Sequence, residues 1–306
     1  MKIKLALLLI LTSFISRAQY TKIPDINFET KLIALGLDSG IADGKVATAN
    51  IVNVEELYVA NLNITDLTGI EGFKNLLSLK CSSNKLKSLD VSNNTMLLYL
   101  DCGSNELSSL KMTNNLVMYG LFCASNRLIN LDLSKNTGLT DVDCSSNKLV
   151  TIDVSKNIKL QKLRISFNAI ASVDVSKNSD LKDLDCGHNK ITSLEVSKNL
   201  KLQRLFCEEN QITSLDVSKN PELYSLVCMF NDLKSLNIKN GSPNFHLEAI
   251  RNPNLTCITV DNVEVAIADK SWGKDKQMNF SLNCNNDIGT SSDTQTIEVP
   301  DNSVGK

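Results

Sequence analysis

Hydrophobic and polar positions alternate along most of this chain in short segments that recur every 21 residues. Within each copy, a leucine or a close relative is followed two positions later by a cysteine in most copies, and the residues between and beside them are polar or aromatic. This period of two is typical of a β-strand with one buried face. The leucine column consists of Leu79, Leu100, Leu121, Val142, Leu163, Leu184, Leu205, Leu226 and Leu247.

Asparagine follows each predicted strand at the same period. A buried asparagine amide both donates and accepts hydrogen bonds, so it can satisfy backbone groups where a strand turns. One copy cannot bury its apolar face alone, whereas stacked copies bury a continuous core and align their asparagines in a structural ladder. The ladder is predicted to contain Asn84, Asn105, Asn126, Asn147, Asn168, Asn189, Asn210, Asn231 and Asn252.

The repeating unit, L-x-x-L-x-C-x-x-N-x-L, resembles the leucine-rich repeat with cysteine in place of its third leucine. The resemblance covers residues 57–260, as about ten coils of 21–22 residues. It implies an α/β-type but mostly β fold, a right-handed leucine-rich-repeat solenoid with a parallel β-sheet on its concave side. It also implies a cap at each end, an N-terminal helical cap and a C-terminal cap, because an open stack must cover its last apolar faces.

The stretch IPDINFETKLIALGLD, in the predicted cap 19–56, indicates a helix. Asp25 is its expected N-cap, Phe28, Leu32 and Leu35 form one apolar face, and Gly36 ends it. The arrangement is similar to the N-terminal cap of internalin-type bacterial surface proteins. It is more similar still to exported repeat proteins of Bacteroidetes-type bacteria.

Residues 1–18 have the pattern of a signal peptide: Lys2 and Lys4, an apolar run from Leu5 to Ile15, and a small-residue cleavage site before Gln19. The run is too short to span a bilayer, and no later stretch is apolar enough. We therefore expect an exported protein, located in the periplasm, at the cell surface or outside the cell. The polar segment 285–306 is predicted to be a disordered linker or tail. No anchor or sorting domain is recognised, which leaves surface attachment open.

Seven cysteines occupy the column three residues before the ladder asparagines. Equivalent side chains on adjacent parallel strands lie ~4.8 Å apart, slightly beyond disulfide range, so we expect reduced core residues. A zinc site is not expected, because the two-residue spacing of a zinc knuckle is missing. Cys257 and Cys284 lie outside the period, around the predicted C-terminal cap 261–284, and are predicted to form a disulfide. The column is Cys81, Cys102, Cys123, Cys144, Cys186, Cys207 and Cys228.

An acidic column is predicted on the convex side, with lysines three residues later. Solvated salt bridges between the two columns are the expected arrangement, although stacked carboxylates are also the oxygen ligands that calcium prefers. The acidic column is Asp90, Asp132, Asp153, Asp174, Glu195 and Asp216, and the lysines are Lys135, Lys156, Lys177, Lys198 and Lys219.

No enzyme motif is present, no cofactor or metal is expected, and the chain has only two histidines. Asp143 and Asp185 are expected two strands apart, but Arg164 between them should keep both ionised, which is wrong for a general acid. The formal net charge of −2 gives no indication of a nucleic-acid partner.

Outward-facing residues of the strands supply the predicted binding surface, in which aromatic side chains accompany opposite charges. Aromatic and arginine side chains are enriched among interface anchors. The main hypothesis is a monomeric, non-enzymatic module that binds a protein partner or mediates adhesion, and the alternatives are a glycan-binding surface module or a passive envelope spacer. The predicted partner-binding residues are Tyr58, Lys80, Tyr99, Asp101, Phe122, Asp143, Arg164, Asp185, Arg204 and Phe206.

Overall fold

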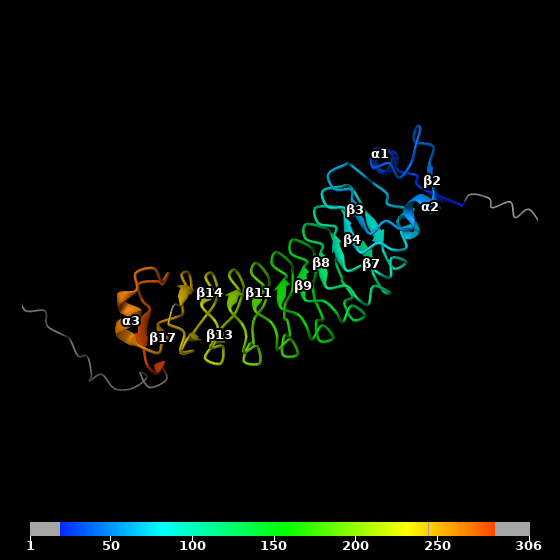
Figure 1. The fold of residues 1–306 in the computed structure, drawn as a ribbon. Helices are drawn as coiled ribbons and strands as arrows, with labels where there is room; N and C mark the ends of the chain where they lie inside the picture. The colour runs from blue at the N-terminus through cyan, green and yellow to red at the C-terminus, as the bar shows by residue number, and fades with distance from the viewer. Residues whose placement is uncertain (1–18, 244, 285–306) are drawn as a thin grey trace, which may run out of the picture. The chain divides into compact units, whose positions relative to one another are not determined.

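The computed structural model describes residues 19–243 and 245–284, and the predicted signal peptide and C-terminal tail lie outside this range. The described chain is a mostly β, parallel solenoid of about eleven turns, which confirms the predicted fold class. It divides into two compact units, Met1–Leu128 and Ile129–Lys306, called unit 1 and unit 2 below. Each turn contributes a three-residue strand to a parallel sheet (Figure 1).

Unit 1 begins with a small cap. The antiparallel pair β1 and β2 accompanies the helices α1 and α2, and the short 3-10 helix η1 follows within the first turn. The parallel strands β3, β4, β6 and β8 then form its main sheet, and β5 and β7 pair on the opposite side of the turns. The bounds are β1 Tyr20–Lys22, α1 Ile26–Ala34, β2 Lys45–Ala47, α2 Thr48–Ile51, β3 Glu56–Tyr58, η1 Ile70–Gly72, β4 Ser78–Lys80, β5 Ser88–Asp90, β6 Tyr99–Asp101, β7 Ser109–Lys111 and β8 Gly120–Phe122.

The predicted cap helix is confirmed with one correction. Asp25 is the N-cap of α1 and accepts hydrogen bonds from the backbone N–H groups of Asn27 and Phe28. Phe28 and Leu32 are buried, but Leu35 is exposed, because it caps the C-terminus of α1 instead of facing the core. Gly36 follows with φ 71°, the left-handed conformation that ends many helices.

Unit 2 continues the same pattern. Strands β9, β10, β11, β12, β14 and β16 form its main parallel sheet, and β13, β15, β17 and β18 pair in parallel on the opposite side of the turns. The parallel pairing thus extends through β17 and β18, although the sequence period fades after Asn252. The bounds are β9 Asp141–Asp143, β10 Lys162–Arg164, β11 Asp183–Asp185, β12 Arg204–Phe206, β13 Ser214–Asp216, β14 Ser225–Val227, β15 Ser235–Asn237, β16 His246–Glu248, β17 Cys257–Thr259, α3 Val263–Ala268 and β18 Asn279–Ser281.

The core consists of stacked columns in register. Leu163 pairs with Leu184 across β10 and β11, and both are fully buried, as is the neighbouring Cys186. Burying each leucine contributes on the order of 1.5–3 kcal/mol, and all turns share the same columns, so the repeat itself supplies most of the stability.

The ladder asparagines join each turn to the preceding one. Asn210 donates from Nδ2 to the carbonyl oxygens of Cys207 and Cys186, at 3.2 and 3.0 Å, and its Oδ1 accepts from the N–H of Ile191 at 2.9 Å. One side chain therefore satisfies backbone groups that would otherwise be buried without partners.

A second asparagine ladder is present that sequence reasoning did not assign a role. Asn199 is fully buried and donates from Nδ2 to the carbonyl oxygens of Val175 and Asn178, each at 2.9 Å. Its Oδ1 has no hydrogen-bond partner among the described residues. The exact 21-residue repeat of this column in the sequence was the available signal. Its members are Asn94, Asn115, Asn136, Asn157, Asn178, Asn199 and Asn220.

Candidate functional site

Every predicted partner-binding residue lies at the first or third position of a main-sheet strand, where the middle residue is buried and its neighbours face outward. This set of outward positions is called the outer strand face. In unit 1 it carries Tyr58 on β3, Lys80 on β4, Tyr99 and Asp101 on β6, and Phe122 on β8; in unit 2 it carries Asp143 on β9, Arg164 on β10, Asp185 on β11, and Arg204 and Phe206 on β12.

In unit 1 the outer strand face is an aromatic cluster around one lysine. The Lys80 ammonium lies 5.0 Å from the ring centre of Tyr58 and 5.6 Å from that of Tyr99, within cation–π range. Tyr99 in turn contacts Phe122, with ring centres 5.1 Å apart. The Tyr58 hydroxyl donates to Glu56 at 2.7 Å, and this hydrogen bond raises the pKa of Tyr58. The structure thus brings four predicted residues into one cluster.

Gly120 on β8 makes this cluster possible. A Cβ atom at this position would lie 3.1 Å from Cδ2 of Tyr99 and 3.2 Å from Cε2 of Phe122. The absent side chain therefore leaves the space in which the two rings meet. The sequence alone does not connect this glycine with its aromatic neighbours, because the connection depends on side-chain rotamers.

Tyr119 is a further member of the aromatic surface that was not predicted. It is 48% exposed, and its ring centre lies 6.5 Å from that of Tyr99. A shallow groove of about 410 Å³ lies beside these rings, bordered by Glu56, Lys80 and Ser78. Unit 1 therefore offers a partly apolar, hollowed surface on its strand face.

In unit 2 the outer strand face is charged and internally paired. Arg204 donates to both carboxylate oxygens of Asp183, at 2.6 and 2.8 Å, and this bidentate contact lowers the pKa of Asp183. Arg164 contacts Asp141 at 3.3 Å, and Lys162 approaches the same carboxylate at 3.9 Å. The ion pairs join adjacent strands, as opposite charges in neighbouring columns are expected to do.

Arg164 was predicted to lie as a charge between Asp143 and Asp185, but its direct ion-pair partner is neither of them. Arg164 pairs with Asp141 instead, and Asp143 accepts from the hydroxyl of Ser145 at 2.6 Å. Burial raises the pKa of Asp185, which accepts from Ser166 at 3.0 Å. The charge of Arg164 lowers the pKa of Asp185, but the effect of burial is larger and the net shift is upward.

Glu208 lies next to Asp185 in space and was not predicted as a site residue. Burial and the nearby charge of Asp185 raise its pKa, and its Oε2 is buried without a hydrogen-bond partner among the described residues. Gly187 supplies the space, since a Cβ there would lie 2.7 Å from the Glu208 carboxylate. Even so, no group of three or more histidine, cysteine, aspartate or glutamate residues in the described ranges is arranged to hold a metal ion.

The residue before each ladder asparagine has a left-handed backbone. The φ angle lies between 50° and 61° at nine successive turns, in a region that side chains other than glycine and asparagine seldom occupy. Unit 1 fills this column with serine, whereas unit 2 changes to larger residues after its first turn. The column is Ser83, Ser104 and Ser125 in unit 1, and Ser146, Phe167, His188, Glu209, Phe230 and Arg251 in unit 2.

The large residues of this column form a ridge beside the strands of unit 2. Phe167 stacks on His188 with ring centres 3.9 Å apart, and His188 Nδ1 lies 3.0 Å from a Glu209 carboxylate oxygen. The Arg251 guanidinium lies 5.9 Å from the centre of the Phe230 ring. Phe167 and Phe230 remain 53% and 45% exposed, so their bulk adds little to the core. These residues are called the left-handed ridge.

On the opposite side of the turns, the direct partner of each acid is serine rather than lysine, which corrects the expected salt bridges. Asp153 and Asp174 each accept a 2.8 Å hydrogen bond from the backbone of the serine two residues later. These serine contacts, with a smaller contribution from nearby lysines, lower the pKa of both aspartates. The acidic column thus closes turns, as aspartate commonly does.

The cysteine column is buried throughout, and Cys81, Cys102, Cys186, Cys207 and Cys228 form no disulfide. Burial raises the pKa of Cys228 to about 12 and that of Cys186 further still, so these thiols stay protonated and unreactive in the folded chain. The predicted disulfide between Cys257 and Cys284 is present. No helix among the described residues is long and apolar enough to cross a membrane.

Comparison with solved structures places the fold. The functional domain of InlJ from Listeria monocytogenes, which is described as including a cysteine ladder, is 25% identical with a TM-score of 0.50, over 86% of this chain and 71% of that one. Internalin C2 from Listeria monocytogenes is 19% identical with a TM-score of 0.53, over 79% and 98%. The leucine-rich-repeat domain of APL1B is 18% identical with a TM-score of 0.54, over 76% of each chain.

These similarities show a leucine-rich-repeat solenoid, with Listeria internalins among its structural neighbours. No family model matches the chain, and no curated protein matches it in sequence. The InlJ domain shares the cysteine ladder by its own description, and in this chain the equivalent column is formed by the buried thiols described above.

Proposed function

We propose that this protein is an exported, non-enzymatic module that binds a protein partner through its outer strand face. The observation that carries the proposal is the aromatic cluster of Tyr58, Tyr99, Tyr119 and Phe122, which stands on a surface where the solenoid needs only polar residues. Solvent-accessible aromatic rings around a lysine resemble the anchor residues of protein interfaces. Leucine-rich-repeat neighbours are typically protein-interaction modules and generally not enzymes, which supports the same conclusion.

The outer strand face of each unit offers a partner different chemistry. The aromatic cluster of unit 1 supplies apolar contact area, which gives affinity when it is covered. The charges of unit 2 already form ion pairs, so a new contact adds little net binding energy. Their contribution is to orient a partner and to exclude partners of the wrong charge. The left-handed ridge, with Phe167 and Phe230 exposed, extends the surface of unit 2 beyond the predicted residues.

Differential capture tests the proposal. The mature chain from Gln19 onward is immobilised beside a variant in which Tyr58, Tyr99 and Phe122 are changed to serine, and envelope or host-surface proteins bound to each are quantified by mass spectrometry. We expect at least one polypeptide to be retained by the wild type and lost from the variant. A control changes Met96, Leu116 and Val117 to serine, since these are exposed apolar residues of unit 1 outside the strands.

Equal retention on all three surfaces would contradict the proposal. Retention of glycans instead of proteins, in a parallel glycan array, would replace the protein partner with a sugar. Export is tested separately: expression with residues 1–18 should yield a chain that begins at Gln19 outside the cytoplasm, and recovery of the uncut chain in the cytoplasm would argue against export.

A further inference from the structure

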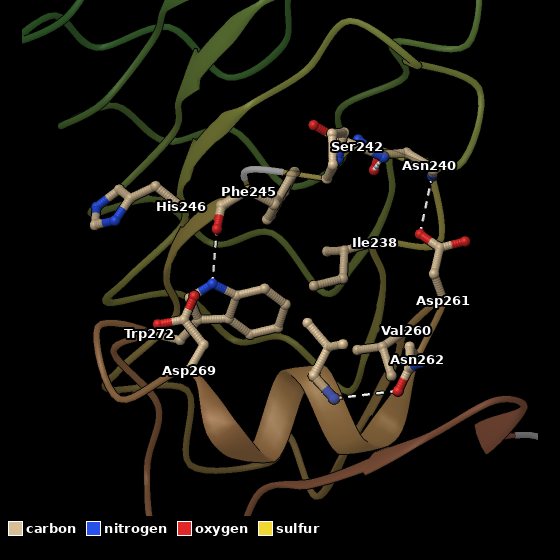
Figure 2. Close-up of a pocket in the computed structure, with 13 residues that line it drawn as sticks. Ile238, Asn240, Ser242, Phe245, His246, Val260, Asp261, Asn262, Asp269 and Trp272 are labelled. Atoms are coloured by element: carbon tan, nitrogen blue, oxygen red, sulfur yellow. Dashed lines mark hydrogen bonds between the residues drawn. The ribbon is translucent and has the colours of Figure 1, made fainter.

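A cavity of unit 2 lies at its C-terminal end, where it meets the outer strand face only at His246. This cap cleft has a volume of about 640 Å³ and is lined by residues 240–243, by Phe245 and by the helix α3. Its floor is apolar: Ile238 and Val260 are nearly fully buried, and Phe245 and Trp272 stand beside them (Figure 2). The volume is that of a small-molecule site.

The walls of the cleft are held in place by covalent and hydrogen bonds. The Trp272 indole N–H donates to the carbonyl oxygen of Phe245 at 2.7 Å, and Asn262 caps α3 by accepting from Val265 at 3.1 Å. The disulfide from Cys257 fixes β17, from which Val260 follows directly. The cleft is therefore formed before any ligand enters, which reduces the ordering cost of binding.

The charge of the lining is negative. Asp261 and Asp269 lie at opposite sides of the apolar floor in Figure 2, and His246 is the basic side chain among the lining residues. One oxygen of Asp261 accepts from the Gly241 N–H at 2.9 Å, and one oxygen of Asp269 accepts from Ser271. The second oxygen of each makes no hydrogen bond within the described residues. The contacts with Ser271 lower the pKa of Asp269, which keeps it ionised at neutral pH.

We propose that the cap cleft binds an apolar group that carries one cationic head, such as an aralkyl ammonium. The apolar body covers Ile238, Val260 and the Trp272 ring, and the cation lies against the carboxylate of Asp261 or Asp269. Charge complementarity selects the cation, because an anion of the same shape would meet two carboxylates at the cleft. The same chemistry is supplied by a free amine or by a lysine side chain of a polypeptide. This inference does not depend on the proposed function of the outer strand face, with which the cleft shares only His246.

Isothermal titration of the mature chain with three compounds of one shape tests the charge preference. The probes are 4-phenylbutylamine, 4-phenylbutanol and 4-phenylbutyrate at one pH and ionic strength. We expect the amine to bind at least tenfold more tightly than the carboxylate, with the alcohol between them. Asp261→Asn and Asp269→Asn should each weaken amine binding several-fold and leave alcohol binding unchanged. Equal or tighter binding of the carboxylate, or no binding of the amine at millimolar concentration, would overturn the proposal.

The location is tested by a matched pair on α3. Val265 lines the cleft and is 58% exposed, whereas Ile267 is 59% exposed on the same helix and does not line it. Val265→Arg should place a cation in the mouth and reduce amine affinity at least tenfold, while Ile267→Arg should bind as the wild type does. Equal losses in both variants, each folded by circular dichroism, would mean that the cleft is not the site.

A final arm distinguishes the two sources of the cation. A short acetylated and amidated peptide with one lysine between phenylalanines is titrated beside the free amine. Tighter binding of the peptide, lost in Val265→Arg, assigns the cleft to a polypeptide side chain. Tighter binding of the free amine, lost in the same variant, assigns it to a small molecule. Each result supports the shared chemistry, and insensitivity of both ligands to Val265→Arg would refute it.

Discussion

The two units have the same core but different outer strand faces. In unit 1, Tyr58, Lys80, Tyr99 and Phe122 pack on one another, and Gly120 leaves the space between the rings. In unit 2, the equivalent positions are mainly ion pairs, such as Arg204 with Asp183. The core columns and asparagine ladders are the same in both. The comparison teaches that the fold constrains the inward positions and leaves the outward ones available for different recognition chemistry.

The residues before the ladder asparagines, which have a left-handed backbone, show the same difference between the two units. Ser104 and Ser125 satisfy it in unit 1 with the same φ as Phe167 and Phe230 in unit 2. Because serine suffices for the backbone, the exposed rings in unit 2 are not required by the fold. A bulky residue in this conformation costs on the order of 1–2 kcal/mol, so its presence favours a functional reason.

The largest expected effect concerns the aromatic cluster. Changing Tyr58, Tyr99 and Phe122 to serine should lower affinity for the captured partner by a thousandfold or more, since anchor residues commonly contribute ~2 kcal/mol each. The corresponding unit 2 variant, Arg164→Ala with Arg204→Ala, should lose roughly tenfold or less, because its charges already have partners. Surface plasmon resonance measures both. A larger loss in the unit 2 variant would reverse the assigned roles.

The second prediction tests what the units share. Asn105→Ala in unit 1 and Asn210→Ala in unit 2 should each lower the free energy of unfolding by about 2–4 kcal/mol, because each leaves several buried backbone groups unsatisfied at ~1–3 kcal/mol per group. Urea denaturation provides the measurement, and the exposed Ser109→Ala is the control. Unequal losses would show that this ladder is not energetically equivalent in the two units.

The third prediction isolates the glycine. Gly120→Ala should weaken partner binding several-fold and change stability by less than about 1 kcal/mol, since the added Cβ displaces flexible ring side chains rather than backbone. Gly103→Ala on the same unit serves as the comparison, because its Cβ would approach a backbone carbonyl at 3.2 Å and no aromatic ring. Unchanged affinity in Gly120→Ala would mean that the ring arrangement does not matter for binding.

The smallest effect concerns the paired charges. The pKa of Asp183 is lowered in the folded chain by Arg204, so this contact contributes stability above the unfolded pKa of about 3.9. That contribution is lost as the pH falls through the lower, folded pKa. Arg204→Ala should therefore cost at most about 1 kcal/mol at neutral pH, and the cost should fall as Asp183 becomes protonated at low pH. Thermal denaturation of both proteins from pH 2 to pH 7 measures this loss of stability. A loss that does not change with pH would argue against the ion pair.

Much of the architecture was predictable because a 21-residue period leaves few alternatives. The strands, the reduced cysteines cited above, the Cys257–Cys284 disulfide and the Asp25 cap follow from residue type and spacing. The outward direction of the strand-face residues follows from the period of two. The roles of Gly120 and Arg164, and the stacking of Phe167 on His188, were not predictable, because each depends on how side chains of neighbouring turns meet.

The sequence by itself determined which side chains are buried, since an exact repeat can bury its apolar face only by stacking in register. Tertiary structure decided which outward residues contact one another. Each outward side chain has one neighbour on the preceding turn and one on the following turn, and its rotamer decides which of the two it contacts. It also placed Trp272, Val260 and Asp261 around one cleft, in a region where the period had already faded. There, only the packing of α3 and the disulfide-linked β17 on the preceding turns brings them together.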